Sequence, residues 1–159
     1  MYDRERLLFG FLHDYAHRLT ADVPDEHAAA QPAPGMNHPA WVLGHLAVAI
    51  DYGLEVLGRP YVAPAAWHDL FAPGTLPLPE RATYPPLAEL LAGYDAAHAA
   101  FGPAAAAADP AILTKPNELG FLQQLPTHGA ILAHLLTTHE AIHLGQLSAW
   151  RRCVGLPAV

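Results

Sequence analysis

The sequence predicts an all-α protein, a four-helix bundle formed by a single domain over residues 1–159. Four segments have the periodicity of amphipathic helices, and no segment has the alternation of polar and apolar residues that strands require. The length is enough for one domain with a sizeable core and hardly enough for two. Four helices in a chain of this length are typical of a bundle.

The first helix is expected over about residues 3–20, and the second from Asn37 to about Leu57. Pro39 lies in the first turn of the second helix, where proline is tolerated, and Gly58 follows its end. The apolar stripe predicted for the first helix consists of Leu8, Phe11, Leu12, Tyr15 and Leu19.

The third helix is expected over about residues 85–101. The fourth is expected from Thr127, a suitable N-cap, to about Val154, before Gly155. The apolar face predicted for the fourth helix consists of Leu132, Leu135, Leu136, Ile142, Leu147 and Trp150.

Residues 58–84 form a proline-rich connection between the second and third helices, in which only residues 65–71 suggest a short helix. A connection of roughly 27 residues can cross along the bundle. The order up-down-down-up, with this long crossover, is therefore at least as well supported as the simple up-down order. A loop of this length is also unusual enough to suggest that it covers something.

Composition excludes several classes of function. The formal net charge is −7 with only eight Lys and Arg residues, which argues against a nucleic-acid surface. The start of the chain is unlike a signal peptide, and the longest apolar run falls short of the roughly 20 residues that cross a bilayer. We therefore expect a cytoplasmic protein with no membrane partner. Histidine is the one excess, with eleven residues.

Two histidines of the fourth helix, His139 and His143, lie four residues apart in the middle of its predicted apolar face. This spacing places their Cβ atoms roughly 5–6 Å apart, so that both rings can reach one metal ion. Buried histidines with structural hydrogen bonds are an equally good explanation. Gln146 and His128 lie beside them, and His134 is predicted on the opposite face, where it can serve as a control.

A third ligand would have to come from another helix, and His45 is the candidate, on the predicted inner side of the second helix. His13 and His17 are also four residues apart, but they lie opposite the apolar stripe of the first helix, and we expect them to be solvated. His98 lies at the edge of the third helix's apolar face. We expect it either to have a structural role or to lie beside the metal ligands.

The string HEAIH, residues 139–143, matches the H-E-x-x-H motif of zinc metalloproteases. In those enzymes the third ligand follows the motif. Residues 144–159 contain no His, Asp or Glu, so the metalloprotease interpretation fails on the number of ligands. A third ligand must then lie upstream, which again indicates His45.

Three segments resemble the DinB/YfiT-like metalloenzyme family: AWVLGHL at 40–46, AAWHDLFAPGT at 65–75 and HEAIHLGQLSAWRRCVGLP at 139–157. The resemblance implies a DinB-like up-down-down-up bundle with nickel or zinc held by His45, His139 and His143. It also implies a homodimer. Leu144 stands where arginine is frequent in the family, so any role of that arginine is absent.

Three neutral histidines leave at least one coordination position open, as in catalytic sites. The resemblance implies a small-molecule substrate and either metal-dependent hydrolysis or transfer that uses a low-molecular-weight thiol. The alternatives are a non-catalytic bundle that a metal stabilises or that senses metal, and a bundle without metal. Glu140 is a weak candidate for a base, and Gln146 for a contact to a ligand carbonyl. Tyr52, Trp41 and Trp67 either line the mouth of the site or only pack.

Overall fold

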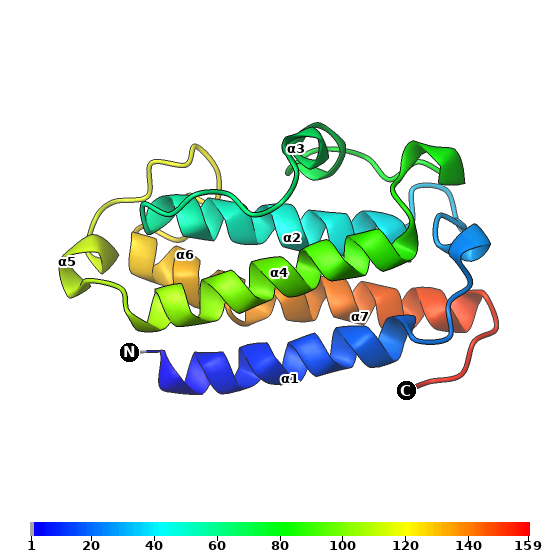
Figure 1. Ribbon diagram of the computed structural model, residues 1–159, viewed down its shortest axis with the longest axis horizontal. Helices are drawn as coiled ribbons and strands as arrows, with labels where there is room; N and C mark the ends of the chain where they lie inside the picture. The colour runs from blue at the N-terminus through cyan, green and yellow to red at the C-terminus, as the bar shows by residue number, and fades with distance from the viewer. Residues whose placement is uncertain (1) are drawn as a thin grey trace.

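Four long helices lie side by side in the computed structural model, which describes residues 2–159 (Figure 1). The long helices are α1 (Asp3–Thr20), α2 (Pro39–Val56), α4 (Leu87–Ala106) and α7 (Thr138–Cys153). The short helices are α3 (Ala65–Phe71), α5 (Pro110–Leu113) and α6 (His128–Leu135), with 3-10 turns η1 (Asp25–His27) and η2 (Arg81–Thr83). Residues 2–159 contain no β-strand, so the all-helical prediction is confirmed. None of these helices combines the length and apolarity needed to cross a membrane.

Helix α2 is at the centre of the protein, and every residue in it except Tyr52 and Glu55 is buried. It begins as the sequence predicts, because His38 caps it: the ring Nδ1 accepts a hydrogen bond from Trp41 N at 3.2 Å. It ends before Gly58, whose φ of +67° is the left-handed conformation that glycine adopts most easily. A helix covered on all sides has no solvent face for a sequence pattern to reveal.

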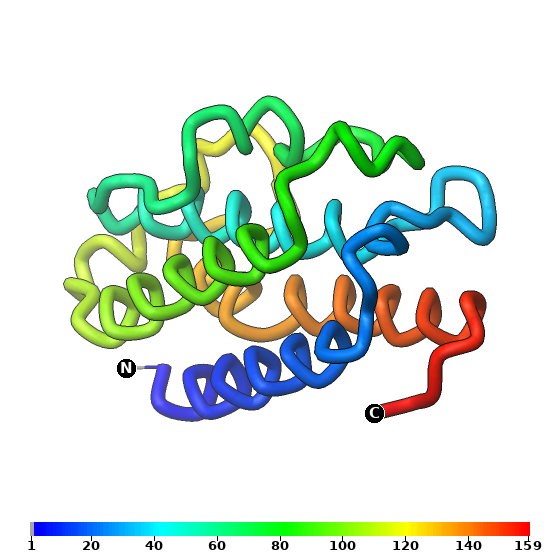
Figure 2. The backbone as a smooth tube through the Cα atoms, turned by 45° about the vertical axis from the view of Figure 1, so that its right-hand side comes forward, coloured from blue at the N-terminus to red at the C-terminus, as the bar shows by residue number. Residues whose placement is uncertain are grey.

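The long connection between α2 and α4 is fastened along α2, on the side of the bundle away from α1 (Figure 2). The buried carboxylate of Asp51 accepts hydrogen bonds from Val62 N at 2.8 Å and from Ala63 N at 3.2 Å. Further on, the ring of Phe71 in α3 lies directly over Gly44, where an added Cβ would be 2.5 Å from ring carbons. The connection is therefore anchored to α2 by a few buried residues and hydrogen bonds rather than forming a loose loop.

The predicted fourth helix is two helices, α6 and α7, with a break at residues 136–137. Two successive threonines provide alternative hydrogen bonds there: Thr137 Oγ1 donates to Ala133 O at 2.6 Å, and Thr138 Oγ1 bonds the ring of His134. The break changes the register of α7 relative to α6. As a result Ile142, predicted to be buried, is 56% exposed, while Leu144 is fully buried.

The apolar stripe predicted for α1 is also partly wrong. Leu8 and Phe11 are exposed, and the buried side of α1 carries Phe9, Leu12, Ala16 and Leu19. Both sides of this helix have apolar residues at helical spacing, so periodicity alone could not choose between them. The chosen side turns His13 and His17 towards α4, where both bond Asp95 and their side chains are partly exposed rather than fully solvated as expected.

The third long helix, α4, continues five residues beyond its predicted end, to Ala106, and includes Pro103. Proline removes one backbone donor and usually ends a helix. Here the residue lies on the exposed side near the end of α4, so only one helical hydrogen bond is lost.

Candidate metal centre

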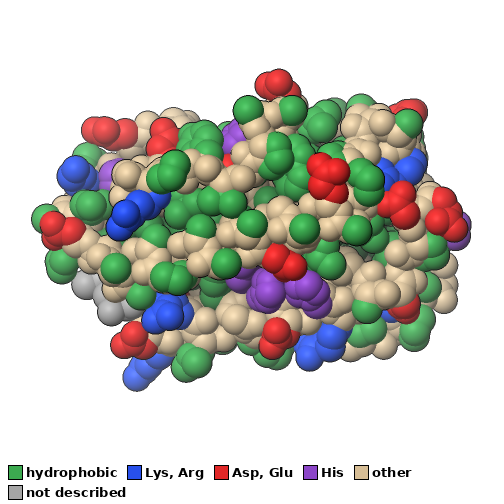
Figure 3. All heavy atoms as spheres, in the orientation of Figure 1, with side chains coloured by type: hydrophobic (Ala, Val, Ile, Leu, Met, Phe, Trp, Pro, Cys, Tyr) green, Lys and Arg blue, Asp and Glu red, His purple; other side chains and the backbone are tan. Residues whose placement is uncertain are grey.

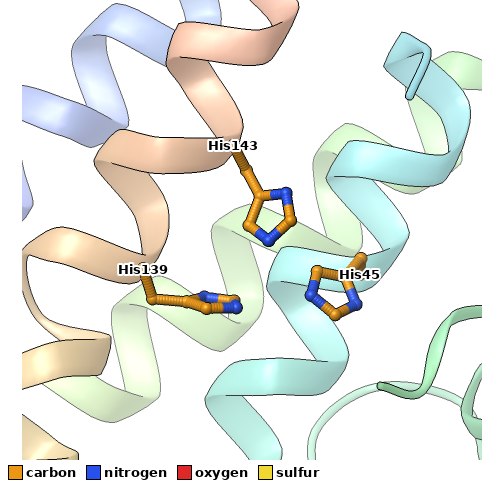
Figure 4. Close-up of side chains that lie close together, drawn as sticks. All are labelled: His45, His139 and His143. Atoms are coloured by element: carbon orange, nitrogen blue, oxygen red, sulfur yellow. The ribbon is translucent and has the colours of Figure 1, made fainter. Parts of the chain in front are cut away.

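Three histidines from two helices meet between α2 and α7 (Figure 4). The ring centroids of His45 and His139 are 5.2 Å apart, those of His45 and His143 4.6 Å, and those of His139 and His143 4.7 Å. Each residue offers one ring nitrogen, and the three nitrogens lie within 4.8 Å of one another. The structure thus brings together the three residues that the sequence singles out, across nearly a hundred positions of the chain.

The long connection orients His45. The Nδ1–H of His45 donates to the carbonyl oxygen of Phe71 at 2.7 Å, which leaves Nε2 as the nitrogen with a free lone pair. The ring of Trp41 stacks on His45 with centroids 4.5 Å apart and an interplanar angle of 9°. Trp41 Nε1 in turn donates to Thr75 Oγ1 at 3.1 Å. The segment that the sequence suggests covers something therefore holds this histidine in place.

His143 is oriented by a side-chain amide. Its Nδ1 donates to Gln146 Oε1 at 3.0 Å, and the same oxygen accepts from Asn37 Nδ2 at 2.8 Å. Gln146 was expected to aim at a ligand carbonyl, but the structure uses its oxygen to hold the His143 ring. Nothing in the sequence points to Asn37 beyond its place at the predicted start of a helix, or to the carbonyl of Phe71.

His134 is not on the opposite face of the helix, contrary to the prediction. Its ring centroid lies 5.4 Å from that of His139, because the break between α6 and α7 turns it back towards the site. Its Nδ1 is hydrogen-bonded to Thr138 Oγ1 at 2.6 Å. His134 is therefore unsuitable as a control residue.

Burial keeps all three rings of the cluster neutral. Desolvation lowers the pKa of His45. Desolvation, with the neighbouring imidazoles adding to it, lowers the pKa of His139 to about 2 and that of His143 to about 4. Within residues 2–159 neither nitrogen of His139 has a hydrogen-bond partner. Neutral, desolvated imidazoles with lone pairs converging on one point fit a zinc-like or nickel-like ion.

Glu140 lies on another side of α7, away from the three histidines. Its carboxylate is 2% exposed and bonds the hydroxyl of Tyr94 and the Nε2 of His98, the latter at 2.7 Å. The other oxygen, Oε2, is buried without a hydrogen-bond partner. His98, expected to have a structural role or a place beside the ligands, is thus engaged by Glu140, and neither residue joins the three-histidine cluster.

A small, mostly apolar pocket of about 30 Å³ lies beside His139. Its lining includes Tyr52, Phe121 and Leu122, so of the two roles left open for Tyr52 the structure supports a place beside the site. Trp67 instead packs over Gly93 of α4 and has only a packing role. The remaining lining residues are Ala49, Pro73, Leu119, Ile131 and Leu135.

His128, predicted to lie beside His139 and His143, is found in a different place. It lines a larger surface pocket of about 490 Å³ together with Glu55 and Lys115, and its Nδ1 is buried without a hydrogen-bond partner. It is not one of the residues whose nitrogens converge.

The family model described as the DinB superfamily matches residues 9–147, a range that contains all three converging histidines. No curated protein matches the chain.

Proposed function

Since the chain belongs to the DinB superfamily, we propose that it is a metal-dependent enzyme whose divalent ion is held by His45, His139 and His143. The observation that carries this proposal is the convergence of three neutral imidazole nitrogens from α2 and α7. The Nδ1 atoms of His45 and His143 are hydrogen-bonded to Phe71 O and Gln146 Oε1. Such bonds orient the rings, as is usual for histidine ligands.

Catalysis is supported by the number of protein ligands and by the pocket. Three ligands leave a coordination position for a substrate, and the apolar pocket beside His139 can hold a small group near it. An ion bound there would act as a Lewis acid that polarises a carbonyl or lowers the pKa of a thiol. Neutral ligands leave the charge of the ion uncompensated, which favours an anionic partner.

Two reaction classes follow: hydrolysis of a small molecule, and transfer that uses a low-molecular-weight thiol. Within residues 2–159 the nearest acidic residue along the chain, Glu140, is turned away from the cluster and engaged by Tyr94 and His98. Hydrolysis commonly uses such a carboxylate as a base, whereas a thiol that binds the ion directly ionises without one. We therefore place thiol-dependent transfer first.

We also propose the up-down-down-up order for the bundle. Figure 1 supports it, because the colours show α1 and α7 running from left to right and α2 and α4 from right to left. A homodimer is proposed as well. Its support is the exposed apolar surface that Leu7, Leu8 and Phe11 form on one side of α1.

Elemental analysis of untagged protein is the first test, and we expect one tightly bound nickel or zinc ion at the three-histidine cluster. Loaded protein is then assayed with low-molecular-weight thiols and small electrophiles, and in parallel with esters and amides. Turnover that requires both thiol and metal supports the transferase. Metal-dependent turnover of esters or amides without thiol supports the hydrolase. Protein that binds the ion but turns over neither class would support the non-catalytic alternative, a metal-stabilised or metal-sensing bundle.

A further inference from the structure

A second group of potential metal ligands lies between α1 and α4, outside the three-histidine cluster. His13 and His17 are four residues apart on α1, and Asp95 faces them from α4. Each histidine Nε2 is 2.8 Å from the same oxygen, Asp95 Oδ1, and the two ring centroids are 4.8 Å apart. One ligand atom from each of the three residues lies within 4.8 Å of the others.

This group reaches the surface. The side chains of His13, His17 and Asp95 are 28%, 40% and 41% exposed. Figure 3 shows histidine side chains gathered beside an acidic side chain midway along the face where α1 and α4 meet. A metal ion can therefore enter from solvent without any rearrangement of the core, and a water molecule can complete its coordination.

The charges around the group favour a cation. In the described part of the chain, the ion-pair partners of Asp95 are these two histidines, with no Lys or Arg among them. The ring of His13 lies 4.5 Å from that of His98, whose Nε2 bonds the buried Glu140 at 2.7 Å. Glu140 likewise has no Lys or Arg partner among residues 2–159. Two carboxylates, those of Asp95 and the buried Glu140, thus lie at either end of a row of imidazole rings. Burial of a carboxylate without a compensating positive charge costs free energy of folding.

We propose that His13, His17 and Asp95 form a second site, which binds a divalent transition-metal ion of the zinc type and joins α1 to α4. Two imidazole nitrogens and one carboxylate oxygen are a ligand set that zinc accepts, with one position left for water. In each imidazole the proton moves from Nε2 to Nδ1 on binding, so that Nε2 offers its lone pair to the ion. The hydrogen bonds to Asp95 are replaced by bonds to the metal.

The simpler explanation is that the two imidazoles only donate hydrogen bonds to Asp95 and no metal binds. Zinc titration of the full-length, untagged, metal-free chain separates the two. We expect the wild type to bind two equivalents of zinc at micromolar free concentration. Asp95→Asn and His17→Ala should each remove the same one of these equivalents, the one at the second site. His45→Ala should remove the other equivalent. The proposed function and the proposed second site are therefore tested independently of each other.

Asp14→Asn is the matched control for Asp95→Asn. Asp14 is exposed on α1, the helix that carries His13 and His17, and its replacement changes the net charge by the same amount. Cys153→Ser controls for binding by the exposed thiol. In His45→Ala protein, zinc should still raise the melting temperature, and it should not do so in the His45→Ala/Asp95→Asn double variant. Nitrogen NMR of His13 and His17 should show the change of tautomer on adding zinc. A single equivalent in the wild type, or a second equivalent that survives both Asp95→Asn and His17→Ala, would overturn the proposal.

Discussion

Replacement of Gly44 by alanine tests how closely α3 and His45 depend on each other. An added Cβ would lie 2.5 Å from carbon atoms of the Phe71 ring, while ordinary contacts begin at 3.4 Å. The ring must therefore retreat by about 1 Å. Phe71 is fully buried, so this movement displaces α3 rather than a free side chain.

Two terms of opposite sign decide the effect on stability. Overpacking a filled core costs about 1–3 kcal/mol, and replacing glycine by alanine inside a helix returns about 1 kcal/mol. We expect Gly44→Ala to lower the free energy of unfolding by up to about 2 kcal/mol. Because the Phe71 carbonyl holds His45 Nδ1, we also expect affinity for zinc to fall about 10-fold or more, as for other groups that orient metal ligands.

Gly10→Ala is the matched control, since a Cβ at Gly10 would meet nothing within 4 Å. It should gain about 1 kcal/mol from helix propensity and leave zinc affinity unchanged. Urea denaturation measures the stability of both variants, and competition with a chelator measures their affinity. If Gly44→Ala matches Gly10→Ala in both measurements, then α3 does not position His45 and the reasoning is refuted.

Three further predictions concern the cluster and the surface of α1. In an Asp95→Asn background, which removes the second site, His45→Ala and His143→Ala should each abolish tight binding of nickel or zinc by elemental analysis, while replacement of the exposed His27 by alanine should retain it; a full equivalent left by His45→Ala in that background would place the third ligand elsewhere. The pKa values of His139 and His143, lowered from 6.5 to about 2 and about 4, mean that the unfolded chain binds more protons below pH 6.5. The melting temperature of metal-free protein should fall as the pH drops from 6.5 towards 4 and below, and a His139→Ala/His143→Ala variant should show a shallower fall; an equal slope would contradict the assigned pKa shifts. Phe11→Asp should dissociate the proposed homodimer in sedimentation experiments without unfolding the chain, whereas a wild type that is already monomeric would remove the basis for that proposal.

The sequence predicted the parts of the fold that local chemistry decides. Pro39 and Gly58 mark the ends of α2 to within two residues, because a helix start tolerates proline and the residue after a helix favours glycine. His139 and His143 were recognisable as a pair from their spacing, and the lack of a downstream ligand pointed to His45. The structure brings these three together.

What the sequence could not predict depends on tertiary contacts. The break before α7 rests on hydrogen bonds of Thr137 and Thr138, and it changed the environments of Ile142 and His134. A continuous helical wheel across residues 127–154 carries the wrong register past such a break. Glu140, a weak candidate for a base, proved buried on another side of α7.

The partners of α1 were hidden for a different reason. When a helix has apolar residues on both sides, its own sequence does not indicate which side is buried. The buried side is then decided by residues elsewhere in the chain. Asp95 on α4 is one such residue, since it binds both His13 and His17. No pattern within residues 3–20 could reveal it.

The fastening of His45 by α3 has a kinetic consequence. The imidazole can swing out of the cluster only when its hydrogen bond to Phe71 breaks and Trp41 moves off its face. Both contacts depend on the segment of residues 65–75, so a single local opening of that segment would release them together. The exchange of an ion held by His45 should then proceed at the rate of this opening, and hydrogen exchange of the α3 amides would report the same rate.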